Sequence, residues 1–236
     1  MSPLLDVHEL SASYGRAQVL FDISLQVQPG EVVALIGRNG AGKTTTLKAI
    51  MGLVSARADR LTFKGQSIVG RPTYGIARLG LGYVPEDRRI FTDLTVAENL
   101  EVGRQAQRGG RSPWDLTRLF ALFPNLAEMR GRRGGHMSGG EQQMLAIART
   151  LMGNPEAILL DEPSEGIAPV IVQTMAQAVR AMKAEGVAVL LSEQNWAFAA
   201  AIADRTCVIE RGSVRFQGTT ADFLKDEALR TETLGV

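Results

Sequence analysis

The chain has 236 residues, 45% of them hydrophobic, and its 26 Lys and Arg residues nearly balance its 25 Asp and Glu residues. This length and apolar content predict one globular domain, and the balanced charge argues against a nucleic-acid-binding protein, which usually carries a basic surplus. The single cysteine, Cys207, excludes an internal disulfide and suits a reducing compartment. No run of about 18 apolar residues occurs, so we expect no membrane-spanning helix.

The first 51 residues predict two strands, then a buried strand and a helix. Residues 4–15 and 18–27 interleave Val, Ile, Leu and Phe with polar residues, as half-buried strands do. Residues 31–37, EVVALIG, form a nearly continuous apolar run, which is typical of a strand buried on both faces. A helix is expected to follow over residues 41–51.

The middle of the chain predicts a mostly helical insert. Residues 95–133 contain few strand signals and several short helical ones. Together with the helix expected after Ser138, the insert spans approximately residues 95–150. Within it, residues 104–113 are expected to form a loop.

The last third returns to alternating strands and helices. Residues 157–160 and 187–191 are apolar runs of strand length, and a helix is expected from Pro169 until Gly186. Residues 205–218 resemble a hairpin. Strands that alternate with helices predict an α/β core with a mostly parallel sheet.

A glycine-rich segment joins the buried strand at residues 31–37 to the helix after it. It contains the pattern G-x-x-x-x-G-K-T, in which backbone N–H groups and a helix N-terminus cradle phosphates, the lysine reaches the terminal phosphates and the threonine hydroxyl binds Mg²⁺. The alternative is a simple strand-to-helix turn, but strand, glycines, lysine and helix all occur in order. The predicted phosphate-binding residues are Gly37, Arg38, Asn39, Gly40, Ala41, Gly42, Lys43, Thr44 and Thr45.

A second motif, AILLDEP, ends a buried strand with two carboxylates. Asp161 is placed to hold Mg²⁺, as is Thr44, and Glu162 is placed to orient and activate the attacking water. An acidic helix cap is the alternative interpretation. The phosphate-binding loop elsewhere in the chain favours the catalytic one.

A third motif, MSGGEQQMLAIARTLM, begins a helix with a capping box formed by Ser138 and Glu141. Gly139 and Gly140 are poor residues for a helix start, but they allow a phosphate to approach closely. The chain thus presents two phosphate-binding helix entrances, which suggests that each serves a different bound ATP.

In this order and spacing, the three motifs resemble the nucleotide-binding subunit of an ATP-binding cassette (ABC) transporter, over the whole chain. The resemblance implies a RecA-like P-loop NTPase core, an N-terminal antiparallel β subdomain and the inserted helical subdomain. It implies ATP and Mg²⁺ as cofactors, and two subunits paired head to tail. Ser138, Gly139, Gly140 and Glu141 of one subunit would then meet the ATP of the other, and Tyr14 would stack on adenine; a simple strand-end aromatic is the alternative for Tyr14.

Two residues depart from the pattern of this family. Glu86, in VPEDRRIF, stands where the family usually has a glutamine, and it is expected to assist in holding Mg²⁺. Gln194, in SEQN, stands where the family usually has a histidine that contacts the γ-phosphate. Glutamine donates a hydrogen bond without a charge, so its contribution to catalysis should be smaller.

The segments VPEDRRIF, DEPSEGIAP and SEQN together resemble the ATP-binding subunits of branched-chain (hydrophobic) amino-acid importers. Importers of urea and short amides share much of this pattern. The resemblance implies a second ATPase subunit, integral membrane permease subunits, an extracytoplasmic solute-binding protein and a peripheral location on the cytoplasmic face of the inner membrane. The alternatives are a soluble ABC ATPase outside transport, a P-loop GTPase or kinase, and a scaffold that binds nucleotide without turnover.

Three apolar residues near the start of the insert admit two interpretations. Phe91, Leu94 and Leu100 are expected to pack in the core. The alternative is a surface on which the permease docks.

Overall fold

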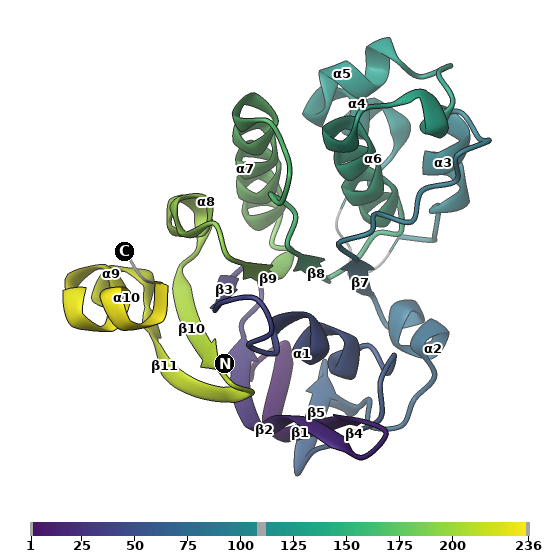
Figure 1. Ribbon diagram of the computed structural model, residues 1–236. Coiled ribbons are helices and arrows are strands. Elements are labelled where there is room, and N and C mark those ends of the chain that lie inside the picture. Colours follow the sequence, from purple (N-terminus) through teal and green to yellow (C-terminus); the bar gives the residue numbers. More distant parts are fainter. Residues whose placement is uncertain (1, 108–111, 235–236) are drawn as a thin grey trace.

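The computed structural model describes residues 2–107 and 112–234. Its strands form two sheets (Figure 1). The first is antiparallel, with the order β2-β1-β5-β6 and β4 beside β1; its strands are β1 (Leu5–Tyr14), β2 (Ala17–Val27), β4 (Ala56–Arg57), β5 (Arg60–Phe63) and β6 (Gln66–Ser67). The second has the order β11-β10-β3-β9-β8-β7; its strands are β3 (Val32–Ile36), β7 (Leu81–Val84), β8 (Ala157–Asp161), β9 (Ala188–Glu193), β10 (Arg205–Glu210) and β11 (Ser213–Thr219). All its neighbours are parallel except β11, which pairs antiparallel with β10.

The central sheet is covered on both faces, which explains the apolar runs in its strands. Alternate residues of β3 enter different clusters: Val33 and Leu35 pack with the antiparallel sheet, whereas Val32, Ala34 and Ile36 pack with helices of the opposite face. The helix α1 (Lys43–Ile50) lies between the two sheets, as its buried Leu47 and Ile50 show. The predicted α/β class with a mostly parallel sheet is therefore confirmed.

The remaining helices of the core flank this sheet. They are α2 (Thr73–Arg78), α7 (Pro169–Ala184), α8 (Trp196–Ile202), α9 (Thr220–Lys225) and α10 (Glu227–Leu234). The helix expected from Pro169 is confirmed, with Pro169 in its first turn and Gly186 just beyond its end. The helix expected over residues 41–51 begins later, at Lys43, because Gly42 has a left-handed φ of 112° that cannot continue into the helix.

Helices dominate residues 96–152, as the sequence predicts. They are α3 (Val96–Val102), α4 (Leu116–Leu122), α5 (Pro124–Glu128), a short 3₁₀ turn (Gly134–His136) and α6 (Gly139–Met152). In Figure 1 they gather beyond β7 and β8, away from the antiparallel sheet. Part of the loop expected over residues 104–113 lies outside the described residues, at 108–111.

The interior of α6 offers a test of this packing. Leu145 is fully buried among the apolar residues shared by α6 and the central sheet. Leu145→Ala is expected to lower the free energy of unfolding by about 3 kcal/mol, because it removes buried methyl groups and leaves a cavity. Leu224→Ala, the same change at a residue that is 44% exposed, should lower the free energy of unfolding by less than about 0.5 kcal/mol. Denaturant titration of both variants measures the two values. Equal losses for the two variants would contradict this packing.

Candidate active site

The carboxyl ends of three parallel strands bring the predicted catalytic residues together. β3, β9 and β8 are adjacent and parallel, so the segments that follow them meet at one edge of the sheet. The glycine-rich loop follows β3, Gln194 follows β9, and Glu162 follows β8. Segments distant in the sequence thus share one site.

The glycine-rich loop wraps around the side chain of Lys43. Nζ of Lys43 donates hydrogen bonds to the carbonyl oxygens of Gly37 at 2.7 Å and Arg38 at 3.2 Å. A Cβ at Gly37 would lie 2.3 Å from the carbonyl oxygen of Ile209, so only glycine fits there. Gly42, whose φ is 112°, needs the left-handed freedom of glycine. These two glycines fix the loop around the lysine.

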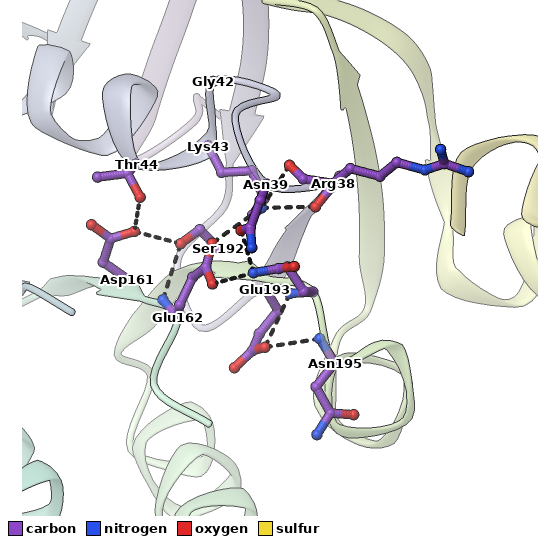
Figure 2. A network of polar contacts seen from close by, with 12 residues as sticks. Arg38, Asn39, Gly42, Lys43, Thr44, Asp161, Glu162, Ser192, Glu193 and Asn195 are labelled. Carbon is purple, nitrogen blue, oxygen red and sulfur yellow. Dashed lines mark hydrogen bonds and ion pairs between the residues drawn. The ribbon is translucent and has the colours of Figure 1, made fainter. Parts of the chain in front are cut away.

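Lys43 and Glu162 form a buried ion pair at the centre of the site (Figure 2). Lys43 is 3% exposed, and its Nζ lies 3.1 Å from Oε1 of Glu162. Oε2 of Glu162 accepts a hydrogen bond at 2.7 Å from Nε2 of Gln194, which also donates to Oδ1 of Asn39. Both oxygens of Glu162 are therefore engaged by groups of the protein.

The environment keeps Glu162 ionised. Burial by itself would raise its pKa, but hydrogen bonds from Gln194 and Glu165 and the charge of Lys43 outweigh burial, and the pKa is lowered. The hydrogen bond to the Glu162 carboxylate, followed by burial, raises the pKa of Glu165. Glu162 therefore holds the carboxylate form needed to accept a hydrogen bond from water.

Asp161 is held by three hydroxyl groups. Oδ1 accepts hydrogen bonds from Thr44 Oγ1 at 2.8 Å and Ser192 Oγ at 2.7 Å, and Oδ2 accepts from the hydroxyl of Tyr83 at 3.0 Å. Burial, followed by the charge of Asp161, raises the pKa of Tyr83, so the phenol keeps its proton. A threonine hydroxyl beside a fixed carboxylate is an oxygen donor set of the kind that Mg²⁺ uses.

The donors present fit a magnesium ion that binds together with phosphates. Among the described residues, no group of three or more His, Cys, Asp or Glu side chains is arranged to hold a metal ion. Mg²⁺ in phosphate-transfer sites is held by one or two carboxylates together with substrate phosphates and water. The pair formed by Thr44 and Asp161 suits that kind of binding.

A cavity of about 500 Å³ opens over this network, large enough for the phosphate chain of a nucleotide. Lys43 contributes the positive charge of its lining, and Glu86, Glu162 and Glu165 contribute negative charge. The lining residues are Val19, Asn39, Gly40, Gly42, Lys43, Thr44, Thr45, Glu86, Glu162 and Glu165. Glu86 thus reaches the site, although it stands in a loop distant in the sequence.

Several predicted residues lie apart from this cavity. Tyr14 ends β1, is 49% exposed and does not contribute to the lining. Ser138 and Glu141 begin α6 and cap it: Ser138 N donates to Glu141 Oε2 at 2.7 Å, and Glu141 N donates to Ser138 Oγ at 3.4 Å. Neither they nor the glycines between them line the cavity. The side chain of Arg38 points away from Lys43 (Figure 2), so only its backbone contacts the site.

Residues 20–165 match the family model described as ABC transporter. The chain belongs to the ABC transporter family. It is 42% identical over 232 residues to the high-affinity branched-chain amino acid transport ATP-binding protein BraG of Pseudomonas aeruginosa, covering 98% of this chain and 100% of BraG. It is 33% identical over 233 residues to the lipopolysaccharide export system ATP-binding protein LptB of Escherichia coli K12, covering 98% of this chain and 97% of LptB. A solved structure of an ATP binding subunit of an ABC transporter has a TM-score of 0.83 and 30% identity, covering 98% of this chain and 96% of that one.

Sequence reasoning missed four polar residues of this ABC transporter ATP-binding subunit. They are Tyr83, Ser192, Glu193 and Glu165, which contact or flank Asp161 and Glu162. Ser192 and Glu193 follow the apolar run at residues 187–191 directly. Ligands of parallel sheets bind at the carboxyl ends of the strands, so polar residues directly after a buried strand are candidates for the site. The sequence therefore contained a signal for Ser192 and Glu193.

Proposed function

We propose that this ABC transporter subunit binds ATP with Mg²⁺, hydrolyses it and energises the import of branched-chain (hydrophobic) amino acids. The observation that carries the proposal is the single network of polar contacts that joins Lys43, Asp161, Glu162 and Gln194 beside the cavity. The similarity to BraG supports the substrate class. Residues 1–236 would form one ATP-binding domain, with the helical insert over approximately 95–150.

Nucleotide binding would exchange the contacts of Lys43. Its Nζ is now satisfied by two carbonyl oxygens and by Glu162, and the phosphates of ATP offer it stronger, anionic acceptors. Residues 37–45 would supply backbone N–H groups, and Thr44, Asp161 and Glu86 would hold Mg²⁺, which neutralises charge on the phosphates. Release of Lys43 leaves Glu162 free to accept a proton from the attacking water, while Gln194 donates to the γ-phosphate.

A second ATPase subunit would complete the pocket. Ser138, Gly139, Gly140 and Glu141 are placed away from the cavity of their own chain, as residues that cap a partner's ATP must be. Tyr14 is proposed to stack on adenine. Both the chain and its partner would dock on a permease at the cytoplasmic face of the membrane, with an extracytoplasmic solute-binding protein acting indirectly and no nucleic acid involved.

A groove of about 610 Å³ between α2, β7, α3 and α6 is the proposed permease-docking surface. Its apolar lining includes the exposed side chains of Tyr74, Val102 and Phe91, and the guanidinium of Arg149 lies 5.2 Å from the centre of the Phe91 ring. The expectation that Phe91 packs in the core is wrong, since its side chain is 48% exposed and lines this groove. Leu100 is fully buried, as expected, and Leu94 is half-buried.

Phe91→Asp is expected to abolish co-purification of the permease, because it replaces an exposed apolar contact surface of the groove with a charge. Phe21→Asp changes a similarly exposed phenylalanine on β2, outside the groove, and should retain the permease. Thermal melting of both proteins checks that they are folded. Permease recovery with Phe91→Asp at the level of the control would remove the groove from the docking proposal.

Affinity purification of the tagged protein from membranes tests the proposed function directly. We expect a permease and a solute receptor for hydrophobic amino acids, and phosphate release that requires Mg²⁺. No helix within residues 2–107 and 112–234 has both the length and the hydropathy that crossing a membrane requires, so attachment would depend on the permease. Recovery with a lipopolysaccharide exporter, a urea or amide permease, or ribosomes would contradict the proposed substrate class.

A further inference from the structure

Glu193 is a buried carboxylate beside the cavity that takes no part in the steps proposed for ATP and water. It is the last residue of β9, is 2% exposed and directly precedes Gln194. Its Oε1 accepts a hydrogen bond from the backbone nitrogen of Ser164 at 2.9 Å. Its Oε2 accepts from the backbone nitrogens of Gln194 and Asn195, both at 3.1 Å (Figure 2). One side chain therefore joins the loop after β8 to the loop after β9.

Each of these two loops carries one of the proposed catalytic residues. Glu162 lies on the loop after β8 and Gln194 on the loop after β9, and their side chains are 2.7 Å apart. Glu162 has a φ of 44°, in the left-handed region that a residue with a Cβ avoids, so neighbouring contacts must hold this backbone. Ser192 holds the backbone nitrogen of Glu162, and Glu193 holds that of Ser164, two residues further along.

The cost of burying a carboxyl group argues that this arrangement is specific. Burial raises the pKa of Glu193, and the hydrogen bonds that three backbone N–H groups donate to its two oxygens offset part of that cost. A side chain without acceptors would leave these donors unpaired at the point where the two loops meet. Both oxygens are needed, because each serves a different loop.

We propose that Glu193 is a positioning residue for ATP hydrolysis, which fixes the loop of Glu162 relative to the loop of Gln194. The proposal rests on the proposed ATPase function of those two residues. Because Glu193 lies outside the phosphate-binding loop, its loss should slow the chemical step and leave nucleotide affinity almost unchanged. A purely structural role would instead show as lower stability with normal turnover.

Two measurements on the full chain separate an effect on the chemical step from an effect on nucleotide affinity. Steady-state ATPase kinetics gives kcat, and calorimetry gives the Kd for ADP. Glu193→Ala should lower kcat by about a hundredfold, since small misplacements of catalytic groups have effects of that order. Glu193→Gln keeps one acceptor oxygen for two loops and should lower kcat by about tenfold. The Kd for ADP should change by less than about twofold in both variants, because phosphate contacts come from the loop around Lys43.

Asn99→Ala is the matched control for lost stability. Asn99 is fully buried and also ties backbone segments together, through hydrogen bonds to Phe91, Leu94 and Thr95 in the insert. It should lower the melting temperature but retain the kcat of the wild type. An equal loss of kcat in Asn99→Ala would attribute the effect to stability and overturn the proposal.

The remaining outcomes separate this proposal from the proposed function. If the wild type turns over and Glu162→Gln does not, while Glu193→Ala keeps the wild-type kcat, the positioning role is wrong and the ATPase stands. If Glu193→Ala does not fold, the same criterion applies to Glu193→Gln. If Glu162→Gln turns over normally, the proposed catalytic role of Glu162 fails by itself.

Discussion

Replacement of Glu162 by glutamine is expected to lower ATP turnover by about a hundredfold to a thousandfold. The amide can still form hydrogen bonds with Gln194 and with water, but it cannot accept a proton at neutral pH. Nucleotide binding should persist, because the loop around Lys43 is unchanged. Phosphate release measures the loss, and gel filtration with ATP should show the variant accumulating as a dimer.

The same substitution should increase the dependence of stability on nucleotide. Without ATP, Glu162→Gln removes the carboxylate from a buried ion pair and leaves the charge of Lys43 with neutral oxygen acceptors only. Breaking a buried pair in this way costs about 3 kcal/mol. ATP supplies new negative charge beside Lys43, so the rise in melting temperature on ATP binding should be larger in the variant than in the wild type.

Glu156→Gln is the matched control for this experiment. Glu156 precedes β8, at the opposite end from Glu162, and pairs with Lys64 outside the site. This variant should keep the wild-type turnover and the wild-type rise in melting temperature on ATP binding. Near-normal turnover in Glu162→Gln would exclude Glu162 as the general base. If ATP raises the melting temperature of Glu162→Gln by the same amount as that of the wild type, the contact between Glu162 and Lys43 does not oppose nucleotide binding.

The parts of the site that are local in sequence could be predicted from it. The glycine-rich loop with Lys43 and the pair Asp161 and Glu162 each occupy consecutive positions beside a buried strand. The position of Ser192 and Glu193 after a buried strand marked them as residues of the binding edge, but the partners of Tyr83, Ser192 and Glu193 could not be assigned. Those partners depend on strand order: β9 lies between β3 and β8, and its register places Ser192 opposite Asp161. No pattern within one segment contains that information.

The exposure of Phe91 could not be predicted for a similar reason. Its apolar side chain and its neighbours suggest core packing, but whether a groove remains open depends on how α2 and the insert are placed beside β7. The start of α1 at Lys43 was missed because only the backbone shows that Gly42 is left-handed. Propensity and periodicity describe segments, whereas these features arise between segments.

Two variants that are inactive alone are expected to regain turnover when they are mixed. Lys43→Ala removes the cation from a subunit's own phosphate site, and Gly139→Asp places a carboxylate at the helix entrance proposed to cap the partner's ATP. The second change should not disturb folding, since a Cβ at Gly139 would meet the flexible guanidinium end of Arg88. In a head-to-tail pair of the two variants, one pocket combines an intact Lys43 with an intact Gly139.

Random pairing of equal amounts would restore about a quarter of the wild-type turnover, because half of the pairs are mixed and each has one complete pocket of two. A protein that carries both substitutions is the control, since no pairing of it with either single variant creates a complete pocket. Wild-type turnover by Gly139→Asp alone would contradict a shared pocket. So would a mixture that never exceeds the sum of its components while the wild-type chain hydrolyses ATP under the same conditions, because a pocket built from two chains must be recoverable from two complementary defects.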